Sequence, residues 1–136
     1  MTYLLDTCVI SAQRRQKTNP GVCSWMQQQA PDDLYISLIT IGEIRAGIHQ
    51  IRHKDPTQAA ALETWFSDVR LFYSNKVLAL SESIIECWGH LGNCRKQHPI
   101  DALVAATAIE YDITLVTRNT KHLADTGVKI LNPWDD

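Results

Sequence analysis

The segment from Ala102 to Thr117 constrains the fold of this chain more than any other part of the sequence. Residues 102–109 are rich in alanine and other small residues and predict a helix. Residues 113–117 follow after a short break and are almost all β-branched or apolar, which predicts a strand. A helix leading into a strand that is apolar on both faces is typical of α/β proteins with a parallel sheet.

The rest of the chain repeats this alternation of strand and helix. Further strands are predicted at residues 2–5, 34–38, 76–80 and 128–131, the last of them at an edge of the sheet. Helices are predicted near residues 7–15, 20–30, 40–51, 56–73, 81–91 and 99–109. We therefore expect an α/β, three-layer fold in which helices flank a central parallel β-sheet, as a single domain over residues 1–136.

Length and composition fit such a domain. The chain has 136 residues, 45% of them hydrophobic and 21% charged, which is the balance of a globular protein with its own core. Its first residues reach Asp6 without a basic flank or a long apolar run, so we expect no signal peptide, no membrane anchor and a cytoplasmic location. The formal charge of −2 neither supports nor excludes a polyanionic substrate.

Four polar residues are predicted at one edge of the sheet. Asp6 directly follows the first strand, and Glu43 falls in the first turn of the helix after the second strand. Asp101 falls in the first turn of the helix that leads to the fourth strand, and Asn119 lies just beyond that strand. In a parallel sheet these positions meet where ligands bind, provided that the first strand lies in the middle.

Each of these residues also has a purely structural explanation. Asp6 is a favourable helix N-cap, and Thr40-x-x-Glu43 has the spacing of a capping box. Asp101 suits the first turn of a helix because of the helix dipole, and Asn119 suits a turn. It is their joint placement after strands that favours a functional site.

A cluster of carboxylates has a definite chemistry. Oxygen ligands select hard cations such as Mg²⁺ or Mn²⁺. These ions activate a bound water for attack on a phosphodiester and neutralise charge on the leaving oxygen. Without metal, the crowded carboxylates repel one another, so the empty site is expected to destabilise the fold.

Other motifs are weaker. His49 and His53 stand at helical spacing, but the glutamate of a zinc protease motif is missing, so we interpret them as an exposed helix face. A metal-free ribonuclease that uses two of the five histidines stays open, although nothing marks the pair. The chain has no Cys-x-x-Cys pair, P-loop or Gly-x-Ser-x-Gly. The basic residues at 14, 15 and 17 are either phosphate contacts or a solvated cluster.

Four blocks of the sequence resemble the PIN-domain ribonucleases, in particular the VapC-type toxins of VapBC type II toxin–antitoxin systems. The blocks are LLDTCVIS from Leu4, SLITIGEIRAG from Ser37, PIDALVAATA from Pro99 and LVTRNTKH from Leu115. They occur in order and at the family's separations over nearly the whole chain, and the tail from Gly127 to Trp134 also matches.

The resemblance implies a PIN fold and a metal-dependent endoribonuclease, a hydrolase that cuts RNA. Asp6, Glu43 and Asp101 then hold Mg²⁺ or Mn²⁺, and Asn119 takes a fourth position that is an aspartate in many relatives. Thr7 and Thr117 match hydroxyls that help to order the site. The family also implies a homodimer and inhibition by a cognate VapB antitoxin.

Two positions depart from the family pattern. Cys8 stands where asparagine is usual, and His122 stands where aspartate is common. With Asn119 neutral, we expect one firmly bound metal and a second that binds loosely. Whether His122 or the nearby Asp125 contributes to the site is left open by the sequence.

Three other functions fit parts of the pattern. A phosphatase of the haloacid-dehalogenase type needs a second aspartate two residues after the first, where this chain has Cys8. A receiver-like signalling domain needs an acidic pair after the first strand, which is absent. A PIN fold that only binds is the third, and the retention of all three carboxylates argues against it.

Overall fold

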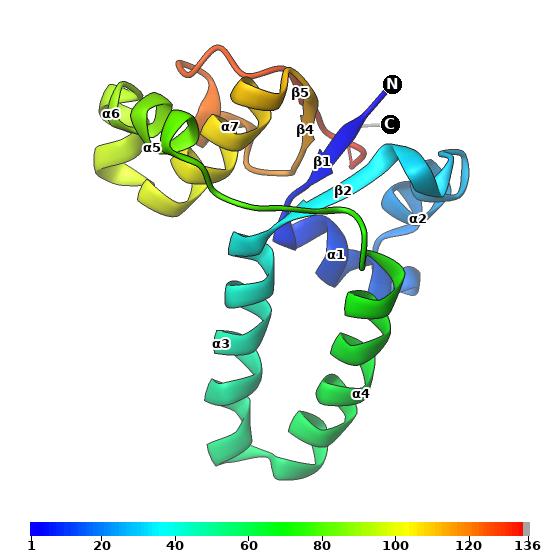
Figure 1. The fold of residues 1–136 in the computed structure, drawn as a ribbon. Helices are drawn as coiled ribbons and strands as arrows, with labels where there is room; N and C mark the ends of the chain where they lie inside the picture. Colours follow the sequence, from blue (N-terminus) through cyan, green and yellow to red (C-terminus); the bar gives the residue numbers. More distant parts are fainter. Residues whose placement is uncertain (135–136) are drawn as a thin grey trace.

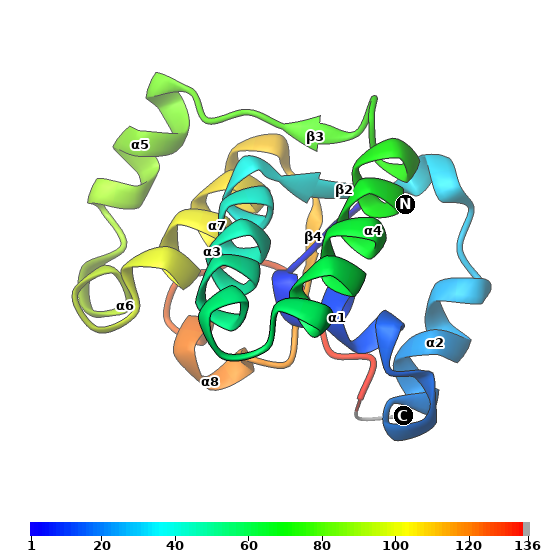
Figure 2. The ribbon, with the colours of Figure 1, turned by 90° about the horizontal axis from the view of Figure 1, so that it is seen from below.

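The computed structural model describes residues 1–134 and has a parallel sheet at its centre. The five strands follow the order β3-β2-β1-β4-β5, and all neighbouring strands pair in parallel (Figure 1; Figure 2). The strands are β1 (Tyr3–Leu5), β2 (Leu34–Ser37), β3 (Val77–Leu78), β4 (Thr114–Val116) and β5 (Ile130–Leu131). The parallel pairing and the central first strand confirm the prediction, although each strand is one to three residues shorter than predicted.

The helices also follow the predicted order, with two additions. They are α1 (Thr7–Arg14), α2 (Pro20–Gln27), α3 (Leu38–Lys54), α4 (Pro56–Phe72), α5 (Glu82–Gly89), α6 (Gly92–Gln97), α7 (Pro99–Tyr111) and α8 (Thr120–Leu123). The prediction missed α6 and α8, because helices of six and four residues are too short to show a periodic apolar pattern. Within residues 1–134, no helix combines the length and the apolar character needed to cross a membrane.

The strand β1 separates two halves of the core. Tyr3 and Leu5 pack into one apolar cluster with residues of α1, α2, α3 and α4. Leu4 points the other way, into a second cluster with residues of α6, α7 and α8. Because successive side chains of a strand face opposite sides of a sheet, a continuous apolar strand requires cover on both faces. This arrangement confirms the predicted three layers.

The helix α7 packs directly on the sheet. Its alanines at 102, 105, 106 and 108 are all fully buried. Small side chains allow the backbone of a helix to approach its neighbours closely, and this packing fixes the position of the whole element. The first turn of α7, which carries Asp101, is thereby held near the carboxyl ends of β1 and β4.

The start of α3 corrects one prediction. The helix begins at Leu38, and the N-cap is Ser37, whose hydroxyl accepts a 3.0 Å hydrogen bond from the amide of Ile39. Glu43 therefore lies in the second turn rather than in the predicted first turn, and the alternative explanation of Thr40 and Glu43 as a capping box does not apply. Both serine and threonine are good caps, and β2 ends one residue earlier than its apolar pattern predicts, so Ser37 takes the position.

Helices α3 and α4 form an antiparallel hairpin that extends away from the sheet (Figure 1). The helix α4 begins at Pro56 as predicted, and Asp55 is its N-cap, since the Asp55 side chain accepts a 3.0 Å hydrogen bond from the amide of Gln58. The apolar stripe of α4 is core: Leu62, Phe66 and Tyr73 are buried. The exposed His49 and His53 lie on α3 as the predicted exposed helix face.

Candidate active site

The site lies where the strand order reverses. From the central β1, the chain continues to β2 on one side, and β4 pairs on the other side. Open parallel sheets leave a crevice at such a point, outside the carboxyl ends of the strands. Asp6 stands at the end of β1, and Thr117 and Asn119 stand beyond the end of β4.

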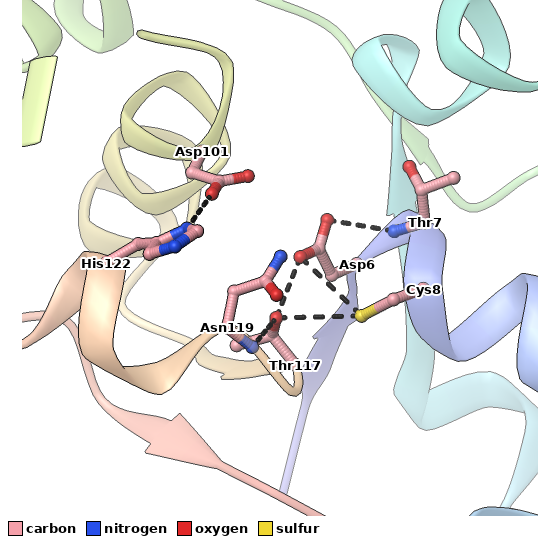
Figure 3. A network of polar contacts seen from close by, with 7 residues as sticks. All are labelled: Asp6, Thr7, Cys8, Asp101, Thr117, Asn119 and His122. Atoms are coloured by element: carbon pink, nitrogen blue, oxygen red, sulfur yellow. Dashed lines mark hydrogen bonds and ion pairs between the residues drawn. The ribbon is translucent and has the colours of Figure 1, made fainter. Parts of the chain in front are cut away.

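Asp6 is the most firmly held of the four predicted residues. It is only 6% exposed. One carboxylate oxygen accepts a 2.9 Å hydrogen bond from the amide of Thr7, and the other accepts a 2.8 Å bond from the hydroxyl of Thr117 (Figure 3). Asp6 is thus the N-cap of α1, as one structural explanation proposed, and it also presents a carboxylate at the sheet edge. The two roles are compatible because capping uses a single oxygen.

Glu43 reaches the same edge from α3. The hydroxyl of Thr7 donates to the carboxylate of Glu43 and also lies 3.1 Å from the hydroxyl of Thr40. Thr7 therefore contacts two of the predicted acids. Its amide donates to Asp6, the N-cap of α1, and its hydroxyl donates to Glu43 on α3. The predicted ordering roles of Thr7 and Thr117 correspond to these contacts, while Thr40 is a participant that the sequence did not reveal.

Asp101 enters from the opposite side, on α7. Its carboxylate lies 2.8 Å from Nδ1 of His122, which belongs to α8 (Figure 3). The backbone amide of Asn119 donates a 3.0 Å hydrogen bond to the hydroxyl of Thr117, so the loop after β4 is tied to the partner of Asp6. The Asn119 side chain points towards the carboxylates (Figure 3).

Cys8 replaces the usual asparagine without making a strong hydrogen bond. Its sulfur lies 3.9 Å from the carboxylate of Asp6 and 3.7 Å from the hydroxyl of Thr117. A thiol is a weak donor, so most of the orientation of Asp6 comes from Thr7 and Thr117. Burial and the charge of Asp6 raise the pKa of the Cys8 thiol, which keeps it neutral.

The carboxylates are electrostatically coupled. Burial raises the pKa of Asp6, and the negative charge of Asp101 raises it further, while the bonds from Thr117 and Thr7 oppose this. The pKa of Glu43 is also raised, by burial first and then by Asp6 and Asp101. Within residues 1–134, no Lys, Arg or His forms a salt bridge with Asp6 or Glu43. A buried carboxylate without a cationic side chain is a suitable ligand for a metal ion.

The carboxylates of Asp6, Glu43 and Asp101 do not lie close enough together in this structure to bind one ion. Among the described residues, the group whose ligand atoms all lie within 4.8 Å of one another is His98, Asp101 and His122. Asp101 therefore belongs both to the carboxylate set and to a histidine group. His98 was not predicted, because its contact with His122 joins the cap of α7 to α8, two segments that are far apart in the chain.

The chain is similar to known proteins over almost its full length. A family model described as PIN domain matches residues 3–129. The chain belongs to the PIN domain family. This membership confirms the family resemblance of the four sequence blocks, and the parallel sheet is consistent with it.

Several PIN relatives cover nearly the same length as this chain. The plasmid stability protein StbB of Pseudomonas syringae is 31% identical over 97% of this chain and 98% of its own. The toxin FitB of Neisseria gonorrhoeae is 29% identical over 98% and 99%, and the VapC ribonuclease Y4jK of Sinorhizobium fredii is 27% identical over 97% of each. The crystal structure of FitAcB from Neisseria gonorrhoeae superposes with a TM-score of 0.86 at 27% identity, over 98% of this chain and 99% of that one.

The metal-free PIN domain is expected to lose stability as the pH rises above about 4, the ordinary pKa of the Asp6 and Glu43 carboxyl groups. Because the pKa values of Asp6 and Glu43 are raised in the folded chain, the folded state binds these protons more tightly than the unfolded state. Their contribution to stability is complete below the unfolded pKa values and is lost as the pH passes through the folded ones. Thermal unfolding in EDTA across this range measures the effect.

The matched variant for this measurement is Asp6→Asn, which removes one of the two titrating groups. Its unfolding temperature should fall less steeply with pH than that of the wild type. Mg²⁺ should restore much of the wild-type stability near neutral pH, because a bound cation compensates the charge. Parallel pH profiles for wild type and variant would show that the raised pKa of Asp6 does not govern the stability.

Proposed function

We propose that this chain is a metal-dependent endoribonuclease and the toxin component of a VapC-type toxin–antitoxin pair. The observation that carries the proposal is the buried carboxylate of Asp6 near Glu43 and Asp101 at the carboxyl edge of a PIN sheet, with no cationic partner for Asp6 within residues 1–134. Relatives named as a VapC ribonuclease and a toxin support the same activity and biological role.

The residues of the chain have distinct tasks in this proposal. Asp6, Glu43 and Asp101 hold Mg²⁺ or Mn²⁺, and Asn119 contributes at most a neutral oxygen, so a second ion binds less tightly. The bound metal would supply an activated water and neutralise charge on the RNA phosphate. Thr117 and Thr7 keep Asp6 in position through the hydrogen bonds described above.

We further propose that the groove beside Glu43 receives the RNA backbone. A pocket of about 170 Å³ joins Thr7 and Glu43 to Arg14, Arg15 and Trp65. Arg14 lies over the ring of Trp65 at 5.6 Å, which fixes its direction. Arginine side chains suit phosphate groups, so the groove provides a path for the RNA backbone to the metal.

Partners and setting follow from the relatives. We propose a cognate VapB-type antitoxin, a homodimer, a cytoplasmic location and a single functional PIN domain over residues 1–136. The last two residues of that range lie outside the described structure. A structural neighbour described as a toxin–antitoxin complex from Klebsiella pneumoniae, 25% identical with a TM-score of 0.67, supports the antitoxin.

The test is cleavage of total RNA by the purified chain after removal of any bound antitoxin. We expect cleavage with Mg²⁺ or Mn²⁺, and a loss of at least about 100-fold in EDTA that is reversed when metal is restored. Refolded chain is used, so that residual antitoxin does not mask the activity, and circular dichroism checks the fold. Undiminished cleavage in EDTA, or no cleavage by folded, antitoxin-free chain, would contradict the proposal.

A further inference from the structure

His98, Asp101 and His122 form a compact group of metal-binding side chains beside the carboxylate site. One ligand atom of each lies within 4.8 Å of those of the other two. His98 is the cap residue before α7, Asp101 lies in the first turn of α7, and His122 lies on α8. The group thus connects two helices that pack against the same face of the sheet.

Two contacts hold the histidines in place. The rings of His98 and His122 are stacked, with centroids 3.6 Å apart and planes within 6° of parallel. Nδ1 of His122 lies 2.8 Å from the carboxylate of Asp101, which is visible in Figure 3. The side chains of His122 and Asp101 are 41% and 22% exposed, so an ion from solvent can reach both.

The histidines also border a cavity. It has a volume of about 200 Å³ and is lined by His98, His122 and Asp125, among others. Lys121 contributes a positive charge to the lining and Asp125 a negative one, so the cavity carries no strong net field. The space is sufficient for an ion that retains one or more waters.

We propose that His98, Asp101 and His122 bind one transition-metal ion of the kind that accepts both nitrogen and oxygen ligands. The expected ion is Zn²⁺. Two imidazoles and a carboxylate are ligands that Zn²⁺ accepts, with water in a fourth position, whereas Mg²⁺ prefers oxygen alone. Tetrahedral bonds of about 2.0 to 2.1 Å place ligand atoms roughly 3.3 Å apart, so the stacked rings tilt when the ion enters. The bonds to the ion would replace the hydrogen bond between His122 and Asp101, and the neutral ring of His122 would carry its proton on the nitrogen that does not bind the ion.

The site shares Asp101 with the proposed catalytic set. An ion bound to one oxygen of this carboxylate withdraws charge from the other oxygen and weakens its attraction for Mg²⁺. Zn²⁺ is therefore expected to raise the Mg²⁺ concentration needed for RNA cleavage. This consequence rests on the proposed function, whereas the binding of the ion does not.

Co²⁺ is the probe for binding, since four-coordinate Co²⁺ absorbs visible light much more strongly than six-coordinate Co²⁺ held by oxygen ligands. We expect the metal-free chain to give this strong absorption with one equivalent of Co²⁺ and to lose it when Zn²⁺ is added. The His98→Ala and His122→Ala variants should bind this ion more weakly. The loss should be at least about 10- to 100-fold, the effect of removing even an outer partner of a metal ligand. The control is the double variant His49→Ala/His53→Ala, which removes the histidine pair of α3, whose rings lie 5.4 Å apart.

The experiments distinguish a failure of the proposed Zn²⁺ site from a failure of the proposed ribonuclease activity. The Asp6→Asn variant should lose RNA cleavage and keep the Co²⁺ spectrum, because Asp6 lies outside the histidine group. Thermal unfolding of each variant shows that the fold is retained. The proposal is overturned if His98→Ala and His122→Ala bind Co²⁺ as the wild type does, or if the α3 double variant loses the ion. Failure of RNA cleavage with an intact Co²⁺ site would contradict only the proposed function.

Discussion

Replacement of Asp6 by asparagine is expected to lower metal-dependent RNA cleavage by at least about 1,000-fold, equivalent to roughly 4 kcal/mol of activation free energy. Asparagine has the same shape as aspartate but carries no charge, so the proposed metal site loses its most buried carboxylate. It is also an equally good N-cap, so α1 should still form. The fold is therefore retained while the activity is lost.

The same substitution should change stability in the opposite direction. In the absence of metal, Asp6 is a buried carboxylate with a raised pKa and no cationic partner among the described residues. Removing this charge relieves the repulsion with Asp101 and the cost of burial, so the metal-free variant should unfold at a higher temperature than the wild type near neutral pH.

A matched control for Asp6→Asn is Asp32→Asn. The side chain of Asp32 is 96% exposed and lies 3.4 Å from Lys76, away from the carboxylates. This variant should keep wild-type cleavage and stability, since exposed ion pairs contribute little. Cleavage by Asp6→Asn within tenfold of the wild type would show that another group holds the essential metal.

The candidate site residues that could be predicted from the sequence are those whose positions depend on neighbouring residues in the chain. Asp6 follows an apolar strand, and Asp101 opens an alanine-rich helix, so each position is defined by its immediate neighbours. The central place of β1 was also predicted. The packing of α7 on the sheet supplies the remaining precision.

The parts that the sequence did not reveal depend on contacts between distant segments. The start of α3 was misplaced because Ser37 and Thr40 are both good caps, and only the end of β2 decides between them. The contact of His98 with His122 needs α8, a single turn with no periodic signal of its own. Such features arise from tertiary packing rather than from local propensity.

Replacement of Phe66 by alanine is expected to be the most destabilising single change in the α3–α4 hairpin. Phe66 is 1% exposed and packs in the core cluster with Leu62 of its own helix and Ile48 of α3. Loss of a buried phenylalanine costs about 3 to 5 kcal/mol, a large share of the roughly 5 to 15 kcal/mol that stabilises a typical domain. The guanidinium carbons of Arg45 and Arg70 lie 5.1 and 5.3 Å from the ring centre and would lose their contacts.

Urea unfolding measures this loss, and Phe72→Ala is the control. Phe72 ends the same helix but is 51% exposed, so its removal should change the free energy of unfolding by only about 0.5 kcal/mol. Equal losses for the two variants would show that α4 is not anchored through Phe66. Because α3 carries Glu43, loosening of the hairpin should also weaken Mg²⁺ binding, whereas Asp6 keeps its bonds to Thr7 and Thr117. Phe66→Leu, which retains most of the buried volume, should recover most of the stability and with it the affinity for the metal.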